Sequence, residues 1–473
     1  MKDISKVNIF NLFLAIILIL TIFSISWKFI VIIVVLFAFF YFNREKIQTE
    51  KFKTIANINT KSVQEIKSFV KENNEVNSSL DLPSLKLLNY GKITLESDKS
   101  IKAKAKLIVD TLKSININVK FVDFTKNPTI IRLVFSTDNI ESRTRISKIQ
   151  NAIKDLSTAL GTRAIKLITV VEGKKNCFAL EMPSDVKNTV KLINVINTDK
   201  FRELKKSLLV KNFYNGLPIA LGIDSDGQEL ILNLCKAPHV LIAGTTGSGK
   251  SVSTVSFIMN LILHHNPKTL NLLMADAKIV ELSIFENLPH LIHPLVTNYA
   301  GTIELLNIAV TKMQERIELC KNAGVKDIAE YNKKFPEKMI PFIVLIIEEF
   351  GEIKLAAPAA DKKDETFDTL IARLGQLSRA MGIHLILTCQ RPDAKIVSPL
   401  IKANMPTRVC FQVTDQTNSR IVIDANGAEA LTGKGDGLFY NGGSITRFQN
   451  AFQDEDEVKK VIEWWENKKD EKN

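Results

Sequence analysis

The sequence is poor in cysteine, and its five cysteines follow no pattern that marks a disulfide framework or a zinc site. They form no C-x-x-C pair and are not paired with histidine at the spacing of zinc ligands. Low-complexity tracts and repeats of about 20–50 residues are also missing, which excludes solenoids and arrays. With 45% hydrophobic and 24% charged residues, the chain is neither disordered nor collagen-like. Its 473 residues predict two or three globular domains in a reducing compartment.

The net charge of +12 is distributed unevenly along the chain. Residues 44–215 contain 32 Lys and Arg against 18 Asp and Glu, whereas residues 216–473 contain 28 against 32. The basic excess therefore lies upstream of the C-terminal half. A nucleic acid or an anionic membrane surface as partner would explain this excess, and so would a lysine-rich solvated surface.

Residues 1–43 are predicted to form a transmembrane hairpin. Between Ile9 and Phe42 the only charged residue is Lys28, and one helix of this length would measure roughly 50 Å, against about 30 Å of hydrocarbon. A polar break before Lys28 divides the stretch into two spans, Ile9–Ser26 and Trp27–Asn43. Basic residues flank both ends, which predicts a multi-pass protein of the cell membrane with both termini in the cytoplasm. A second apolar run and the lack of a small-x-small cleavage site argue against a cleaved signal peptide.

The rest of the chain is predicted to be of the α/β class. Residues 44–81 are polar with weak helical periodicity and predict a juxtamembrane helix and linker. Residues 82–215 mix a helical pattern with short β-branched stretches and predict a small α/β domain. Residues 216–473 alternate apolar strands with helices, the pattern of βαβ units around a parallel sheet. The strands expected there are Val240–Ala243, Leu270–Ala275, Ile343–Ile347 and Ile383–Thr388.

A nucleotide-binding motif follows the first of these strands. Gly244, Thr245, Thr246, Gly247, Ser248, Gly249, Lys250 and Ser251 fit G-x-x-x-x-G-K-[ST] at every fixed position, between a strand and a helix. In this motif glycines let backbone N–H groups face the phosphates, the lysine carries a charge to the β- and γ-phosphates, and the hydroxyl ligates Mg²⁺. We therefore predict an ATP site with Mg²⁺ held at Ser251.

Two further strand ends are expected to complete the site. Ile343–Ile347 is followed by Glu348, which we expect in the Mg²⁺ shell, and by Glu349, which we expect to orient and polarise the attacking water. Ile383–Thr388 is followed, after Cys389, by Gln390, which could sense the γ-phosphate or make an ordinary hydrogen bond at a strand end.

The chain resembles the FtsK/SpoIIIE family of hexameric DNA translocases over residues 82–465. The matching stretches include Leu82–Leu88, Ala237–Val252, Arg379–Leu385 and Gly427–Glu429, together with Pro289-His290-Leu291, Gln390-Arg391-Pro392 and Gly435-Asp436. The resemblance implies a RecA-like P-loop motor that assembles as a homo-hexameric ring with DNA in its pore. It also implies that Arg379 is an arginine finger that reaches the ATP of the next subunit, and that Arg391, Lys395 and Arg420 lie on pore loops that contact DNA phosphates.

Several departures from the family pattern bear on function. Glu348 stands where the family has Asp, and Asp276-Ala277-Lys278 stands where it has Asp-Pro-Lys, with no role assigned. After the amphipathic stretch Glu455–Trp465 we expect no winged-helix domain, a domain of roughly 60–70 residues that reads DNA sequence. This, with two spans rather than about four, resembles the coupling proteins of Gram-positive conjugative plasmids and integrative elements, which pump DNA toward a secretion channel.

The leading hypothesis is therefore a membrane-anchored, ATP-driven DNA translocase for conjugation, with a relaxase and secretion-channel proteins as possible partners. A cell-division or sporulation chromosome translocase remains open. In a different class, so does an ATPase that powers protein export.

Overall fold

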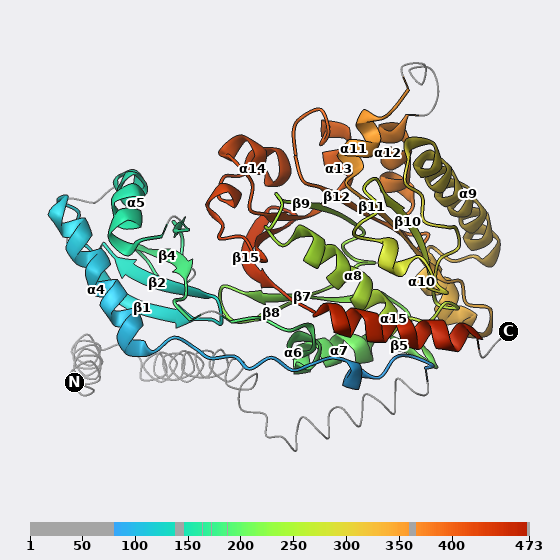
Figure 1. The fold of residues 1–473 in the computed structure, drawn as a ribbon, viewed down its shortest axis with the longest axis horizontal. Coiled ribbons are helices and arrows are strands. Elements are labelled where there is room, and N and C mark those ends of the chain that lie inside the picture. The colour runs from blue at the N-terminus through green and yellow to red at the C-terminus, as the bar shows by residue number, and fades with distance from the viewer. Residues whose placement is uncertain are drawn as a thin grey trace, which may run out of the picture. The chain divides into compact units, whose positions relative to one another are not determined.

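The computed structural model describes residues 80–137, 146–162, 164–171, 173–186, 188–358 and 366–470 (Figure 1). The predicted transmembrane hairpin (1–43) and nearly all of the predicted linker (44–81) lie outside these residues. Within the described ranges, no helix combines the length and the apolar character that a membrane span requires.

A four-stranded antiparallel sheet in the order β1-β2-β4-β3 forms a small domain with two helices. Helix α4 is capped at its N-terminus by Ser97, whose side chain accepts a hydrogen bond from the Ser100 amide. The helix buries Ile101, Ala105, Ile108 and Leu112 at helical spacing. This stripe packs with α5 against one face of the sheet (Figure 1). The elements are α4 (Asp98–Ser114), β1 (Lys120–Lys126), β2 (Ile130–Ser136), α5 (Ile146–Leu160), β3 (Lys166–Ile168) and β4 (Cys177–Pro183).

A nine-stranded sheet in the order β10-β11-β12-β9-β13-β14-β15-β7-β8 forms the motor domain. Neighbours from β10 to β13 are parallel, whereas every pair from β13 to β8 is antiparallel. The prediction of a parallel sheet is therefore wrong for almost half of the strands, and the sheet is mixed. The strands are β7 (Pro218–Asp224), β8 (Glu229–Asn233), β9 (His239–Ala243), β10 (Leu270–Asp276), β11 (Phe342–Glu348), β12 (Ile383–Cys389), β13 (Thr407–Phe411), β14 (Asp436–Asn441) and β15 (Ser444–Asn450).

Side chains that alternate along the central strands bury both faces of this sheet. Along β11, Val344 and Ile346 face one apolar core, and Leu345 and Ile347 face the other. Helices α6, α7, α8 and α15 cover the first face, and α9 to α14 cover the second (Figure 1). The helices are α6 (Leu192–Ile196), α7 (Asp199–Leu208), α8 (Lys250–His264), α9 (Tyr299–Ala323), α10 (Ile328–Lys334), α11 (Phe350–Leu355), α12 (Phe367–Leu377), α13 (Pro399–Asn404), α14 (Gln416–Ile423) and α15 (Glu455–Asp470). Shorter elements are η1 (Leu85–Leu87), β5 (Leu209–Val210), β6 (Phe213–Tyr214), η2 (Ser283–Phe285), η3 (Pro336–Lys338) and η4 (Ala428–Ala430).

Residues 82–215 divide their buried side chains between two cores. The core of the small domain contains residues from Ile101 to Met182. The segments on either side, which include Leu82, Leu85, Val190 and Phe201, pack instead into the core of the motor. The chain thus enters the motor core, leaves it to form the small domain, and returns.

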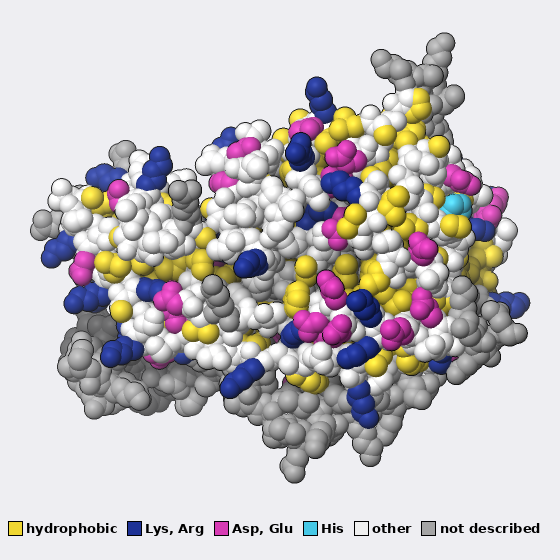
Figure 2. All heavy atoms as spheres, in the orientation of Figure 1, with side chains coloured by type: hydrophobic (Ala, Val, Ile, Leu, Met, Phe, Trp, Pro, Cys, Tyr) yellow, Lys and Arg dark blue, Asp and Glu magenta, His cyan; other side chains and the backbone are white. Residues whose placement is uncertain are grey.

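The basic excess of the N-terminal half is partly displayed on the small domain. The exposed side of α4 carries Lys99, Lys102, Lys106 and Lys113. On the face shown in Figure 2, lysine and arginine predominate over the small domain, whereas both signs of charge alternate over the motor.

Five histidines lie in the interior of the motor and are held neutral there. Burial lowers the pKa of His239 and His290 to about 4, that of His265 and His384 to about 3, and that of His264 well below its usual value. In the unfolded chain the same side chains take up protons below about pH 6.5. The unfolded state therefore binds more protons than the folded state between about pH 6.5 and 4, and stability must fall as the pH falls through that window.

We expect the denaturant midpoint to decrease markedly from pH 6.5 to pH 5. Most carboxylates titrate below this window, and burial raises the pKa of Asp224 and Glu229, which opposes the decrease. Urea unfolding followed by circular dichroism at half-unit pH steps measures the effect. An unchanged midpoint between pH 7 and 5 would contradict the account.

Candidate nucleotide site

The glycine-rich loop of residues 244–249 connects β9 to α8. At its start the amides of Gly244 and Thr245 donate to the carbonyls of Cys389 (3.2 Å) and Gln412 (2.9 Å), the residues at the ends of β12 and just after β13. Gly249 precedes α8 with φ of 109°, in the left-handed region. A Cβ atom at Gly249 would lie 2.5 Å from the amide nitrogen of Gly435. The loop therefore requires glycine there for both backbone conformation and space.

A turn formed by residues 433–435 is hydrogen-bonded to this loop. The amides of Lys434 and Gly435 donate to the carbonyls of Gly247 (3.2 Å) and Ser248 (2.8 Å). The turn is held by Asp436, whose carboxylate accepts two hydrogen bonds from the buried guanidinium of Arg447, at 2.9 and 2.7 Å. Burial alone would lower the pKa of Arg447, but the charge of Asp436 more than offsets it and raises that pKa. The Gly435-Asp436 pair singled out in the sequence is thus the support of the phosphate-binding loop.

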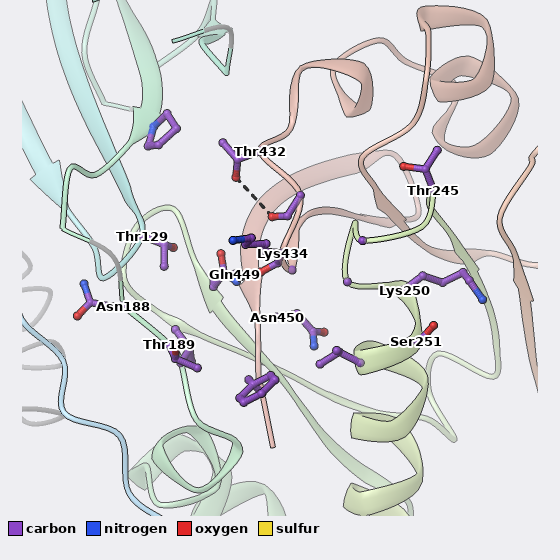
Figure 3. A pocket seen from close by; sticks show the side chains of 18 of the residues that line it. Thr129, Asn188, Thr189, Thr245, Lys250, Ser251, Thr432, Lys434, Gln449 and Asn450 are labelled. Atoms are coloured by element: carbon purple, nitrogen blue, oxygen red, sulfur yellow. Dashed lines mark hydrogen bonds between the residues drawn. The ribbon is translucent and has the colours of Figure 1, made fainter. Parts of the chain in front are cut away.

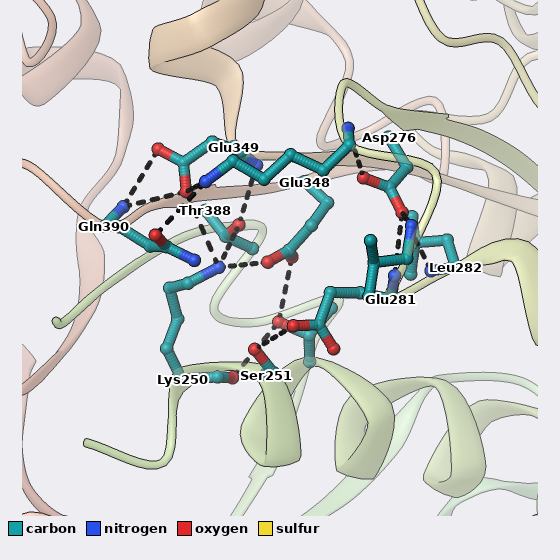
Figure 4. Close-up of polar contacts among 12 residues, drawn as sticks. Lys250, Ser251, Asp276, Glu281, Leu282, Glu348, Glu349, Thr388 and Gln390 are labelled. Atoms are coloured by element: carbon teal, nitrogen blue, oxygen red, sulfur yellow. Dashed lines mark hydrogen bonds and ion pairs between the residues drawn. The ribbon is translucent and has the colours of Figure 1, made fainter. Parts of the chain in front are cut away.

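Lys250 lies between the loop and the acidic strand end of β11 (Figure 4). Its ammonium is ion-paired with Glu348, lies 4.0 Å from a carboxylate oxygen of Glu349, and donates to the hydroxyl of Thr388 at 3.3 Å. Lys250 and Glu348 are each only 2% exposed. Thr254, one turn along α8, donates to the second oxygen of Glu348 at 3.2 Å. The lysine and the first acid of the predicted pair therefore neutralise each other in a buried position.

Glu349 occupies a strained position next to them. Its φ of 53° lies in the left-handed region, which non-glycine residues seldom adopt outside functional sites. The Glu349 amide donates to the Thr388 hydroxyl at 3.1 Å, and its carboxylate accepts the amide of Gln390 at 3.1 and 3.2 Å. The structure therefore brings Glu349 and Gln390 together, as the positions of their strands predict. The contact is made by the backbone N–H of Gln390 and not by its side chain.

Three site residues had no role in the sequence analysis: Asp276 at the end of β10, and Lys278 and Glu281 in the loop that follows it. The buried carboxylate of Asp276 accepts the amides of Lys278, Val280, Glu281 and Leu282 at 2.9 to 3.1 Å, which fixes the shape of the loop. This presents Lys278 to the side-chain oxygen of Gln390 (3.2 Å) and to the carboxylate of Glu349 (3.8 Å). It also presents Glu281 to the Ser251 hydroxyl at 2.6 Å. The signal in the sequence was Asp276 at the end of β10, directly opposite Glu348 in the parallel register.

Arg379 lies apart from this cluster. It precedes β12, whereas Gln390 and the phosphate-binding loop follow the carboxyl ends of β12 and β9. Seven strand residues at about 3.3 Å each separate the two edges by roughly 20 Å. Consistently, the charge of Arg379 adds to the effect of burial in lowering the pKa values of His239 and His384, which begin β9 and β12. The exposed Arg379 is therefore too far away to reach the nucleotide of its own subunit.

The three residues predicted to contact DNA are exposed on the two segments that follow the carboxyl ends of β12 and β13. Arg391 and Lys395 belong to the turn after β12. The Asp393 side chain stabilises this turn by accepting hydrogen bonds from the backbone amides of Lys395 and Ile396, at 2.8 and 2.9 Å. Arg420 lies on α14, which follows β13, and its guanidinium donates to Asn426 at 2.7 Å. Both loops thus leave the sheet at the edge that carries the nucleotide site.

A glycine-rich loop with a buried lysine, a strand-end acid pair and a polar side chain just after the neighbouring strand defines a P-loop ATPase of the α/β class. The model of the FtsK/SpoIIIE family matches residues 201–394, and that of the FtsK alpha domain matches residues 82–184. The chain belongs to the FtsK/SpoIIIE family.

Two curated relatives and one solved structure show the extent of the similarity. DNA translocase FtsK of Caldanaerobacter subterraneus is 37% identical over 383 residues, which is 80% of this chain and 50% of the relative. DNA translocase FtsK of Pseudomonas aeruginosa is 33% identical over 413 residues, which is 81% of this chain and 49% of the relative. This chain thus spans about half of each of these relatives. The structure of the pCW3 conjugation coupling protein TcpA, solved with ATPγS, superposes with a TM-score of 0.50 and 26% identity, over 76% of this chain and 99% of that one.

Glu349→Gln is expected to bind ATP and fail to hydrolyse it, because an amide cannot accept a proton from the attacking water. The measurement is phosphate release together with equilibrium binding of a fluorescent ATP analogue. Glu352→Gln, an exposed position one turn along α11, is the matched control and should retain activity. Near-normal turnover of Glu349→Gln would show that another group is the base.

Proposed function

We propose that this protein is an ATP-driven DNA translocase that works as a ring of identical subunits. The observation that carries the proposal is the joint arrangement of Lys250, Glu349 and Gln390 at one edge of the sheet, with two exposed basic loops leaving the same edge. Hydrolysis at this edge can therefore be transmitted to the loops directly, since Gln390 is followed in the chain by Arg391.

ATP is the nucleotide that this site would take, with Mg²⁺ as its metal. Ser251, Glu281 and Glu348 supply a hydroxyl and two carboxylates within one cluster, which is the set of hard oxygen donors that Mg²⁺ prefers. Ser251 and Glu348 would hold the ion, directly or through water. Bound there, it would neutralise charge on the phosphates. Lys250 would exchange Glu348 for the phosphates, and Glu349 would accept the proton of the attacking water.

Assembly as a hexameric ring is supported by the position of Arg379. An exposed arginine about one strand length from its own nucleotide site is placed to act on another subunit. In the ring, DNA would pass along the loops of Arg391, Lys395 and Arg420, whose charges contact phosphates without reading sequence.

For the cellular role, we favour a coupling protein that pumps DNA into a conjugative transfer channel. This rests on the likeness to TcpA, which extends over 99% of that chain. Its partners would be a relaxase and secretion-channel proteins. The chain would be a multi-pass protein of the cell membrane with both termini in the cytoplasm, anchored by residues 1–43. A chromosome translocase of cell division or sporulation is the second candidate, favoured by the identity to proteins named DNA translocase FtsK.

DNA is expected to stimulate ATP hydrolysis, and the combined variant Arg391→Ala/Lys395→Ala is expected to lose most of the stimulation while keeping the basal rate. Removing phosphate contacts should also flatten the salt dependence of DNA affinity. The measurements are ATPase rates with single- and double-stranded DNA and binding at several salt concentrations. Lys338→Ala, an exposed cation at the opposite edge of the sheet, is the control. Equal loss in both variants would refute the assignment of the loops.

Arg379→Ala should bind ATP normally and lose on the order of 10³-fold in turnover, because no cation from the neighbour stabilises the departing phosphate. Mixing it with Glu349→Gln should restore part of the activity, since an intact Glu349 can then face an intact Arg379. The measurement is ATP turnover of mixed rings whose composition is verified by mass. Absence of rescue even in a single turnover would show that Arg379 does not act on the ATP of the neighbouring subunit.

A further inference from the structure

The phosphate-binding loop occupies one end of a cavity of about 870 Å³, which is in the range of sites that enclose small molecules. Figure 3 shows Lys250 and Ser251 on one side and Thr129, Asn188 and Thr189 on the other, with Lys434, Gln449 and Asn450 between them. A triphosphate bound to Lys250 and Ser251 would fill only the first side. We propose that the remaining part is the binding site for the nucleoside of ATP, with Phe452 as its stacking surface and Asn450 as its polar contact.

The chemistry of the lining changes along the cavity. The charged side chains that line it are Lys250 and Glu281 at the phosphate end and Lys434 in the middle. Beyond them the described lining is neutral, with apolar surface from Pro183, Val186, Val190 and Phe452. An uncharged, flat, partly apolar group fits such a surface, whereas further phosphates or acidic groups do not.

Phe452 is a half-buried ring next to the beginning of α8. The following residue, Gln453, donates its side-chain amide to the Val252 carbonyl at 3.1 Å, which places this segment beside the turn that carries Ser251. The Phe452 amide donates to the Val190 carbonyl at 2.8 Å, and the Leu192 amide donates to the Phe452 carbonyl at 2.8 Å. Two walls of the cavity, one from each side, are thus joined by backbone hydrogen bonds, which fix the backbone that carries the ring. The ammonium of Lys191 lies 5.0 Å from the centroid of the ring, so a base would stack on the ring face that this ammonium leaves open.

Asn450 provides an unused hydrogen-bond acceptor. It is 2% exposed, and its side-chain nitrogen donates to the Ala451 carbonyl at 2.6 Å, while Oδ1 has no partner among the described residues. A buried carbonyl without a partner is costly, so a ligand donor at this place would be favoured. Adenine offers its exocyclic amine, whereas guanine carries a carbonyl oxygen at the corresponding ring position. The backbone N–H of Asn450 donates to the Gly435 carbonyl at 2.8 Å. This bond fixes the position of Asn450 relative to the turn that supports the phosphate-binding loop.

The inference rests on the proposed ATPase function and adds to it the residues that recognise the nucleoside. Because Pro183 and Val186 come from the end of the small domain, bound ATP would contact both the motor and the chain segment that leads to that domain.

The test compares ATP with inorganic tripolyphosphate, which lacks the nucleoside. Affinities are measured calorimetrically on the full chain in detergent, with Glu349→Gln as the background so that ATP is not consumed. Phe452→Ala should weaken ATP binding about tenfold or more, as expected for loss of a stacking partner, and change tripolyphosphate affinity less than twofold. Phe452→Tyr should retain ATP affinity. Phe335→Ala, a half-buried aromatic outside the cavity, is the matched control and should alter neither ligand.

A second variant does not depend on the packing of Phe452. Thr189 is exposed and lines the cavity, so Thr189→Trp should fill the nucleoside site and weaken ATP binding without affecting tripolyphosphate. Equal effects on both ligands, or no effect on ATP, in Phe452→Ala and Thr189→Trp would overturn the proposal. If Lys250→Ala instead left the affinity for both ligands unchanged, the proposed ATPase function itself would be wrong.

The preference for ATP over GTP, measured in the same experiment, tests the role of Asn450. The Glu349→Gln background should bind ATP more tightly than GTP, and Asn450→Ala should reduce that preference. Equal affinity for ATP and GTP before the substitution would overturn the assignment of Asn450 to the base.

Discussion

The parallel hydrogen-bonding register that places β12 between β9 and β11 is the constraint on which the rest of the site depends. Leu385–Cys389 pairs with His239–Ala243 on one side, and Ile383–Leu387 pairs with Ile343–Ile347 on the other. The three carboxyl ends therefore meet at one edge, where Lys250, at the end of the loop after β9, reaches past β12 to pair with Glu348 at the end of β11. Thr388 lies at this crossing, where its hydroxyl contacts both Lys250 and the Glu349 amide. Backbone pairing of the three strands thus positions the site, and its side chains lie close enough to contact one another directly.

The groups expected to bind ATP and Mg²⁺ are paired with one another in the structure. Lys250 is paired with Glu348, Ser251 with Glu281, and Lys278 with Glu349 and Gln390. The buried Lys250–Glu348 pair loses much of its Coulomb energy to desolvation, so either partner can be exchanged at modest net cost when a ligand supplies equivalent charge. A ligand that brings phosphates and a divalent cation together satisfies both halves of the network at once. This pairing provides a physical reason for selecting metal-bound nucleotide over either component alone.

Much of this arrangement follows from the sequence, because strand ends followed by polar residues mark the edge of a parallel sheet. The strands expected at Val240–Ala243, Leu270–Ala275, Ile343–Ile347 and Ile383–Thr388 are β9, β10, β11 and β12. The antiparallel half escaped prediction because alternation of apolar residues identifies a strand but not its partner. Asp276, Lys278 and Glu281 escaped because their role depends on a loop held by hydrogen bonds to one carboxylate, which has no periodicity. The division of residues 82–215 between two cores is likewise a property of packing, since an apolar segment such as Leu192–Ile196 does not specify which core it joins.

Displacement of a triplex-forming oligonucleotide from duplex DNA tests the central claim most directly, because it reports movement along DNA rather than hydrolysis. The account predicts that the full chain displaces the oligonucleotide with ATP, and that it does not do so with a non-hydrolysable analogue or in the Glu349→Gln variant. ATP hydrolysis stimulated by DNA without any displacement from double-stranded substrates, and without movement on single strands in the equivalent streptavidin-displacement assay, would contradict it.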